Sequence, residues 1–212
     1  MTTQDSKMVA FAAVTAAATA AGAAADSSVN EFLAQIKSPD DKVRGPAWQG
    51  AARQGAPAVK PLAEIMANPD MEVARAAKRA LWKIVRHAGR PGAAKEGKAV
   101  VAQLIPVLSG AATPVRREVL WMLSEIGGDE AVAPLAAWLA DKELREDARC
   151  ALQRIPGNKA TAALKKALAT GPEEYRPAVA VSLRARGEKV DGYPSQKLVP
   201  TKQTTVQRLP TT

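Results

Sequence analysis

The stretch VRREVLWMLSEIG at residues 115–127 contains the pattern that decides the fold. A Val-Arg pair opens it, apolar residues recur every three or four positions, and a glycine closes it. Related stretches begin at residues 43, 73, 144 and 175, so successive starts lie 30, 42, 29 and 31 residues apart. Internal repetition with a period near 30 predicts that copies of one small structural unit stack along the chain.

A second apolar phrase follows each of the first four copies. It reads AVKPLAEIM (58–66), VVAQLIPVL (100–108), AVAPLAAWL (131–139) and ATAALKKAL (160–168). Both phrases place their apolar residues on one side of a helix, so each repeat is predicted to be a hairpin of two helices. Since neither helix can bury its apolar side alone, neighbouring hairpins must stack. The sequence therefore predicts an all-α, right-handed α-solenoid of stacked helical hairpins.

Positions 1, 5, 9 and 12 of the first phrase share one helical side and form the predicted core. Three copies supply these residues: Val73, Ala77, Leu81 and Ile84; Val115, Val119, Leu123 and Ile126; and Leu144, Ala148, Leu152 and Ile155. Glycine at position 13, as in Gly127, is expected to end the helix. Trp48 and Trp138 are also predicted to be core residues, and Pro106 is expected to kink or delay its helix.

The repeats divide the chain into three parts. Residues 26–190 are the predicted repeat domain, with a half-repeat cap at 28–36, four full repeats and a final partial repeat. Residues 191–212 are rich in Thr, Gln and Pro, and we expect an irregular or disordered tail there. Residues 1–25 are interpreted as a signal peptide or a disordered leader.

The leader consists of Lys7 and then the uncharged stretch MVAFAAVTAAATAAGAAA (8–25). A basic residue, an apolar stretch and small residues at its end are typical of a secretory signal peptide. We therefore expect export to a bacterial periplasm or cell envelope, and a cytoplasmic protein with an alanine-rich leader is the alternative. Because alanine and threonine insert poorly into a bilayer, no membrane span is expected in the mature chain.

The composition excludes several kinds of site. One cysteine (Cys150) excludes an intramolecular disulfide and a cysteine-based zinc site, and one histidine (His87) excludes a histidine metal cluster. We find no set of residues that fits a catalytic site and expect no cofactor. The formal net charge of +9 permits an acidic protein, a nucleic acid or an anionic membrane as partner.

The repeat pattern resembles HEAT repeats, and more closely the short HEAT-like repeats of the phycobilisome-lyase type. The residues that carry the resemblance are the Val-Arg, Leu-Arg and Tyr-Arg pairs at 43–44, 115–116, 144–145 and 175–176, with Ala77, Leu81, Leu123, Ile126 and Gly127. The resemblance implies an adaptor or scaffold surface. Some similar proteins are lyases that attach tetrapyrroles, and some bind DNA. The matched positions are structural, so no lyase or glycosylase residue is carried over.

The strongest candidate for a binding surface is a basic region at residues 75–98, where eight basic residues oppose Glu96 alone. It includes an insertion at 86–97 that is predicted to be a loop, in which His87 would be a solvated residue. A basic side with an exposed aromatic suits phosphates, stacked bases or acidic protein segments. The predicted partner-binding residues are Arg75, Lys78, Arg79, Trp82, Lys83, Arg86, Arg90, Lys95, Lys98 and Trp121. The alternative is a solvated outer helix in which Trp82 packs under the inserted loop, while Trp121 packs between repeats.

Three functions are consistent with these observations. The leading hypothesis is a non-enzymatic scaffold or adaptor that binds another protein with an acidic surface. The alternative is binding of a nucleic acid or another anionic polymer through the region at 75–98. A weaker alternative, implied only by the resemblance, is lyase-like handling of a chromophore.

Export gives the first prediction. Mass spectrometry of the protein purified from its native host should show a chain that begins near Asp26, because cleavage is expected after the alanines at 23–25. Recovery of the intact leader in the cytosolic fraction would contradict export.

Overall fold

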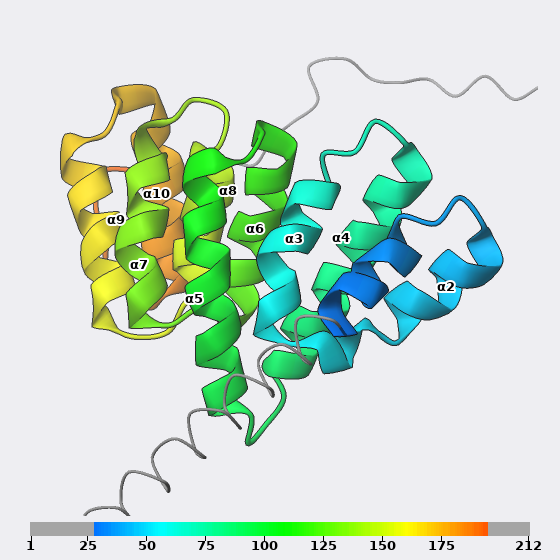
Figure 1. Ribbon diagram of the computed structural model, residues 1–212. Helices are drawn as coiled ribbons and strands as arrows, with labels where there is room; N and C mark the ends of the chain where they lie inside the picture. Colours follow the sequence, from blue (N-terminus) through cyan, green and yellow to red (C-terminus); the bar gives the residue numbers. More distant parts are fainter. Residues whose placement is uncertain (1–27, 195–212) are drawn as a thin grey trace, which may run out of the picture.

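The computed structural model describes residues 28–194. The predicted leader at 1–25 and the tail beyond residue 194 lie outside these residues. Within 28–194 every regular element is a helix and no strand occurs. The helices stack side by side along one axis (Figure 1), so the prediction of an all-α solenoid is confirmed.

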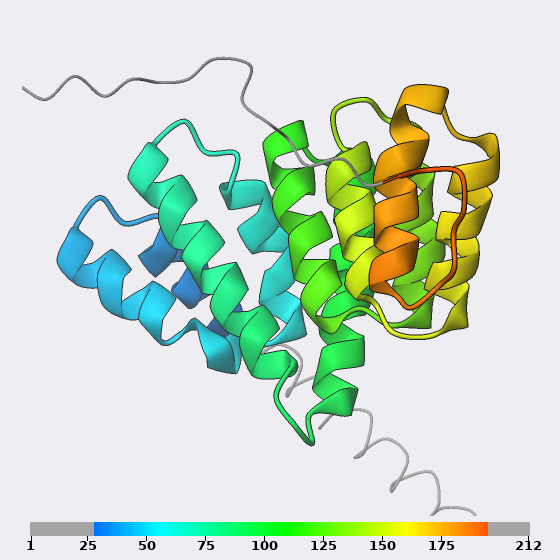
Figure 2. The same cartoon turned by 180° about the vertical axis from the view of Figure 1, so that it is seen from behind.

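The helices form two layers, one from each phrase of the repeat (Figures 1 and 2). The first layer contains α2 (Asp41–Gln49), α4 (Met71–Ala88), α6 (Thr113–Ile126), α8 (Arg145–Arg154) and α10 (Arg176–Ala185). The second contains α3 (Val59–Ile65), α5 (Ala94–Gly110), α7 (Asp129–Ala136) and α9 (Asn158–Thr170). Short 3-10 helices join them: η1 (Ala51–Gln54), η2 (Ala56–Ala58), η3 (Ala137–Ala140) and η4 (Glu173–Tyr175). A helical segment at 28–36 precedes them.

The core lies between the two layers and follows the predicted positions. Of the twelve core residues predicted from the first phrase, eleven are buried, and Ile126 is half-buried against the same cluster. Phe32 and Ile36 of the segment at 28–36 are buried in this cluster as well. One continuous apolar core therefore runs through the stack.

Local contacts fix where the helices begin and end. Asp70 caps α4, because its Oδ1 accepts hydrogen bonds from the backbone N–H groups of Glu72 (2.8 Å) and Val73 (3.3 Å). Gly127 follows the last residue of α6 with φ −70°. Glycine is needed here because a Cβ would clash with the carbonyl oxygen of Leu123. The close approach of the Leu123 carbonyl oxygen explains this glycine, since its backbone is not left-handed.

The recurring arginines at position 2 of the repeat are structural. Arg44 is buried and donates to the carbonyl oxygen of Ser38 at 2.7 Å, and Arg176 donates to that of Gly171 at 3.0 Å. Both bonds satisfy carbonyls of the preceding turn. The guanidinium groups of Arg116 and Arg145 instead lie over aromatic rings, those of Trp138 (4.9 Å) and Tyr175 (4.6 Å) respectively. Trp138 is half-buried and packs against the core.

The insertion is mostly helical, so the prediction of a loop at 86–97 is wrong. Helix α4 continues to Ala88 and α5 begins at Ala94, which leaves only residues 89–93 between them. Alanine and lysine favour helix, and Gly97 is tolerated because it lies in the first turn of α5. The longer hairpin extends past its neighbours (Figure 1). Helix α5 also runs through Pro106 without a break.

Among the helices at 28–194, none combines the length and the apolar character that crossing a bilayer requires.

The core assignment gives the second prediction. Leu123 is fully buried in the middle of the stack, so Leu123→Ala should lower the free energy of unfolding by about 2–5 kcal/mol. Urea denaturation followed by circular dichroism measures this change. Met71→Ala is the control: Met71 is 62% exposed, and its replacement should alter stability by no more than about 0.5 kcal/mol. Equal effects of the two substitutions would contradict the core assignment.

Candidate partner-binding site

A pocket of about 640 Å³ lies on the first layer, between α4 and the segment formed by α2 and η1. Its charged lining residues are all basic, and two tryptophans complete the wall. The lining consists of Trp48, Ala52, Lys78, Arg79, Trp82, Lys83, Arg86, His87 and Arg90. The pocket therefore combines concentrated positive charge with apolar ring surface.

The period of α4 brings these residues together. Arg79, Lys83 and Arg86 are four and three residues apart, so they lie along one exposed side of the helix. Leu81 and Ile84 are buried on the other side. The same amphipathic pattern that packs α4 into the core thus aligns its basic side chains along the pocket.

Each tryptophan of the pocket carries an arginine over its ring. The Cζ atom of Arg79 lies 5.2 Å from the ring centre of Trp48, and that of Arg86 lies 5.0 Å from the ring centre of Trp82. Such cation–π contacts are worth about 0.5–1 kcal/mol at exposed sites. Trp48 was predicted as core. It is half-buried and packs against the core, but it also lines the pocket.

Trp82 also belongs to a contact between repeats. Its Nε1 donates to the Oε2 atom of Glu118 on α6 at 3.0 Å, and Lys78 forms an ion pair with the same carboxylate. One repeat further on, Asp147 on α8 accepts hydrogen bonds from Trp121 Nε1 at 3.0 Å and Arg117 Nε at 3.0 Å. Glu118 and Asp147 both occupy position 4 of their repeats. At both of these boundaries between repeats, a carboxylate of the following repeat therefore accepts a hydrogen bond from an indole and pairs with a basic side chain.

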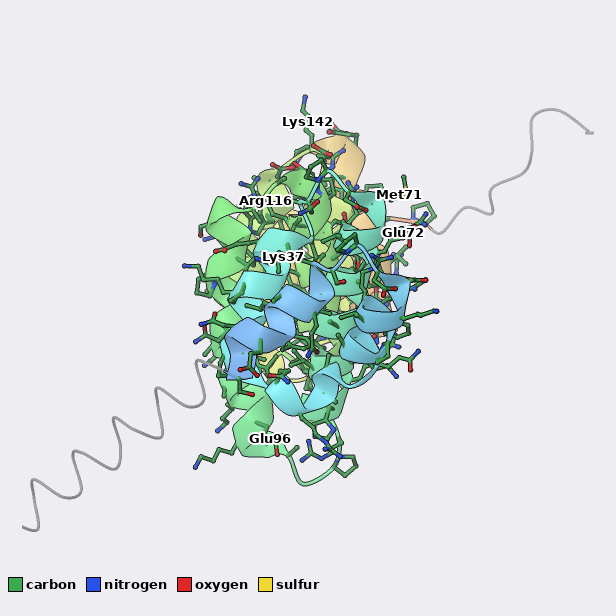
Figure 3. All side chains as sticks on the ribbon, turned by 45° about the vertical axis from the view of Figure 1, so that its right-hand side comes forward. Lys37, Met71, Glu72, Glu96, Arg116 and Lys142 are labelled. Atoms are coloured by element: carbon green, nitrogen blue, oxygen red, sulfur yellow. The ribbon has the colours of Figure 1, made fainter. Side chains whose placement is uncertain are left out.

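Two pocket residues near the end of α4, His87 and Arg90, lie close to Glu96 in the first turn of α5. Arg90 donates to both carboxylate oxygens of Glu96, at 2.9 and 2.7 Å, and His87 Nε2 lies 3.9 Å from the same group. The hydrogen bonds from Arg90 hold the pKa of the Glu96 carboxyl below its usual value. His87 lies in the last turn of α4, so its prediction as a loop residue is wrong. Figure 3 shows Glu96 at the projecting end of the hairpin, away from Met71 at the start of α4.

The predicted partner-binding residues therefore separate into two groups. Six line the pocket: Lys78, Arg79, Trp82, Lys83, Arg86 and Arg90. The other four do not line it: Arg75, Lys95, Lys98 and Trp121. Trp121 is 36% exposed and contacts Asp147 on the side of α6 that faces α8. Trp82 and Trp121 were both predicted as partner-binding residues, but the second aromatic residue of this pocket is Trp48.

Two further hollows lie along the second layer and are lined mainly by small residues. One, of about 610 Å³, includes Ala63, Ala67 and Val107 of α3 and α5, with Lys60 and Glu64 at its edge. The other, of about 450 Å³, lies two repeats away along α7 and α9. Neither groups several charges of one sign as the pocket on α4 does.

One known protein family matches part of this chain. Residues 101–184 match the family described as HEAT repeats. No curated protein matches the chain. A designed armadillo repeat protein in complex with the peptide (KR)4 is 18% identical, with a TM-score of 0.43 over 73% of this chain and 80% of that chain. A computationally designed armadillo repeat protein for modular peptide recognition is 20% identical, with a TM-score of 0.43 and the same coverages.

The matched segment runs from α5 to α10 and contains the hairpins whose period the sequence shows. Hairpins of the same kind precede it in the stack. Residues 101–184 therefore consist of HEAT repeats, and they continue a stack of helical hairpins that begins before them.

Proposed function

We propose that this protein is a non-enzymatic interaction scaffold that docks an acidic segment of a partner protein in the pocket between α2 and α4. The observation that carries the proposal is the lining of that pocket, in which all charged side chains are basic and two are backed by tryptophan rings. Stacked helical repeats form extended surfaces that bind other macromolecules, which agrees with this role.

Charge and aromatic surface would contribute in different ways. Clustered positive charge draws an acidic partner toward the pocket and raises the association rate. Tryptophan and arginine are the residues that most often dominate binding energy at the centre of an interface. Trp48 and Trp82, each next to an arginine, give the pocket both kinds of anchor.

The arginines favour a protein over a single-stranded nucleic acid. Proteins that bind single strands stack the bases on open aromatic rings. In this pocket the guanidinium groups of Arg79 and Arg86 already lie over the rings of Trp48 and Trp82. A base would have to displace them, whereas an acidic side chain can bind them where they are.

Export remains part of the proposal. It rests on the leader at 1–25, which lies outside the described residues, and it would place the partner in the periplasm or cell envelope.

Charge reversal gives the third prediction. Arg79→Glu combined with Lys83→Glu should abolish capture of the native partner and leave the fold intact, because both side chains are exposed. The matched control reverses the exposed residues Lys142 and Arg154, which do not line the pocket, and so changes the net charge equally. Quantitative mass spectrometry of proteins captured in the native host compares the two variants. Circular dichroism verifies that both are folded.

The partner should be retained by the control variant and lost by the pocket variant. Equal retention by the two variants would show that the interface lies elsewhere, and the small-residue hollows of the second layer would be the next surface to test.

Salt dependence gives the fourth prediction. Binding of the purified partner should weaken as salt rises from about 0.1 M to about 1 M, because the screening length falls from about 10 Å to about 3 Å. Surface plasmon resonance should show the change mainly in the association rate. An affinity that stays the same over this range of salt concentration would contradict binding guided by charge. Steep salt dependence with every nucleic acid tested, and no protein partner, would favour the alternative function.

A further inference from the structure

We propose that the pocket recognises two carboxylates of a short extended peptide segment, one bound by the Arg79 guanidinium and the other by the Arg86 guanidinium. This inference rests on the proposed function and names the chemistry of the docked segment. Three properties of the basic side chains support it: which of them lack an acidic partner, how the rings position them, and how far apart they lie on α4.

Carboxylates of the protein itself already occupy part of the pocket's positive charge. Lys78 is paired with Glu118, and Arg90 is paired with Glu96 through two hydrogen bonds. Arg79 and Lys83 have no acidic partner within 4.0 Å among residues 28–194, and Arg86 has only Glu125 at 3.9 Å from its Nε. The cations left for a ligand are therefore Arg79, Lys83 and Arg86.

The tryptophan rings limit the positions of the two guanidinium groups, which favours binding of a planar ligand such as a carboxylate. A guanidinium stacked on an indole keeps its N–H groups free at its edge, in the fork that matches both oxygens of a carboxylate. The Cζ atom of Arg79 lies over the ring of Trp48, and that of Arg86 over the ring of Trp82. Because stacking limits the rotamers of the free arginines, less side-chain entropy is lost when a ligand binds. A lysine at either position would supply charge without the fork.

The spacing of the arginines selects the ligand's backbone. Arg79 and Arg86 are seven residues apart on α4, so their Cα atoms are separated by about 10 Å along the helix. In a polyproline II segment, residues three apart lie on one side and are separated by about 9 Å. An extended segment with acidic residues at i and i+3 therefore has a spacing close to that of the two Cα atoms, and Lys83 lies between them on the same helix. The pocket volume of about 640 Å³ is within the range of sites that hold small ligands.

The fifth prediction tests this with a fluorescein-labelled, proline-rich peptide whose two glutamates stand three residues apart. Fluorescence anisotropy measures its affinity for the full chain. Arg79→Lys combined with Arg86→Lys keeps every charge but removes both forks, and should weaken binding by about tenfold or more. The control, Arg75→Lys with Arg154→Lys, makes the same chemical change outside the pocket and should leave the affinity within about twofold.

Two comparison ligands complete the test. A peptide with the same composition but adjacent glutamates should bind about fivefold more weakly, because one carboxylate then misses its arginine. A single-stranded oligonucleotide of equal charge should bind no better than the matched peptide. Tighter binding of the oligonucleotide would overturn the assignment to carboxylates.

Three other results would overturn the inference. They are no binding of the matched peptide, equal binding by the pocket variant and the wild type, and equal affinity for the two peptides. None of them decides the proposed function, which depends on whether the native partner is lost with Arg79→Glu and Lys83→Glu. Retention of that partner would remove the proposed function itself.

Discussion

The structure depends on the burial of one apolar side of every helix against the next repeat. A single hairpin of about thirty residues is too small to enclose a core. Leu81, Leu123 and Leu152 occupy the same position in successive repeats, and all three are fully buried in one continuous cluster. Stability is therefore shared between neighbours, and the fully exposed positions on the outer side of each first helix are free of packing requirements. That freedom permits the basic side of α4.

Polar contacts on the outer side pair some of its charged side chains within the protein. Glu118 receives Trp82 and Lys78 from the preceding repeat, and Asp147 receives Trp121 and Arg117. These contacts join consecutive helices of the first layer and use cations that a count of charges would treat as free. The cations available for the proposed binding are those outside these pairs, so the net charge alone describes the proposed site poorly.

Repetition in the sequence was sufficient to predict the core. The spacing of positions 1, 5, 9 and 12 identified buried residues because each repeat faces a copy of itself, so one pattern is observed several times. The same reasoning placed Arg75, Arg79, Trp82 and Arg86 together on the side of this helix opposite the core. Residues that lie far apart in the sequence could not be related in this way. The stacking of Arg79 on Trp48 joins two repeats, and no periodicity within either repeat reports it.

The errors at the insertion have a similar cause. Gly89, Pro91 and Gly92 do mark a turn, but the residues on both sides extend α4 and α5 instead of lengthening the loop. Local propensity alone could not decide between these outcomes, because the start of α5 is also held by a contact with the connecting turn, between Arg90 and Glu96. His87 and the basic residues around it were therefore placed correctly near the surface but in the wrong kind of element.

The long α4–α5 hairpin also breaks the translational symmetry of the array. A solenoid of equal repeats presents the same groove at each step, and an elongated ligand can bind it in several registers that differ by one repeat. Here the α4–α5 hairpin is longer than its neighbours (Figure 2). Within residues 28–194, two arginine-covered tryptophans line one pocket only, the one beside this hairpin. A partner that contacts both features can bind in a single register. The position of the long hairpin would then determine which repeat each other part of the partner contacts.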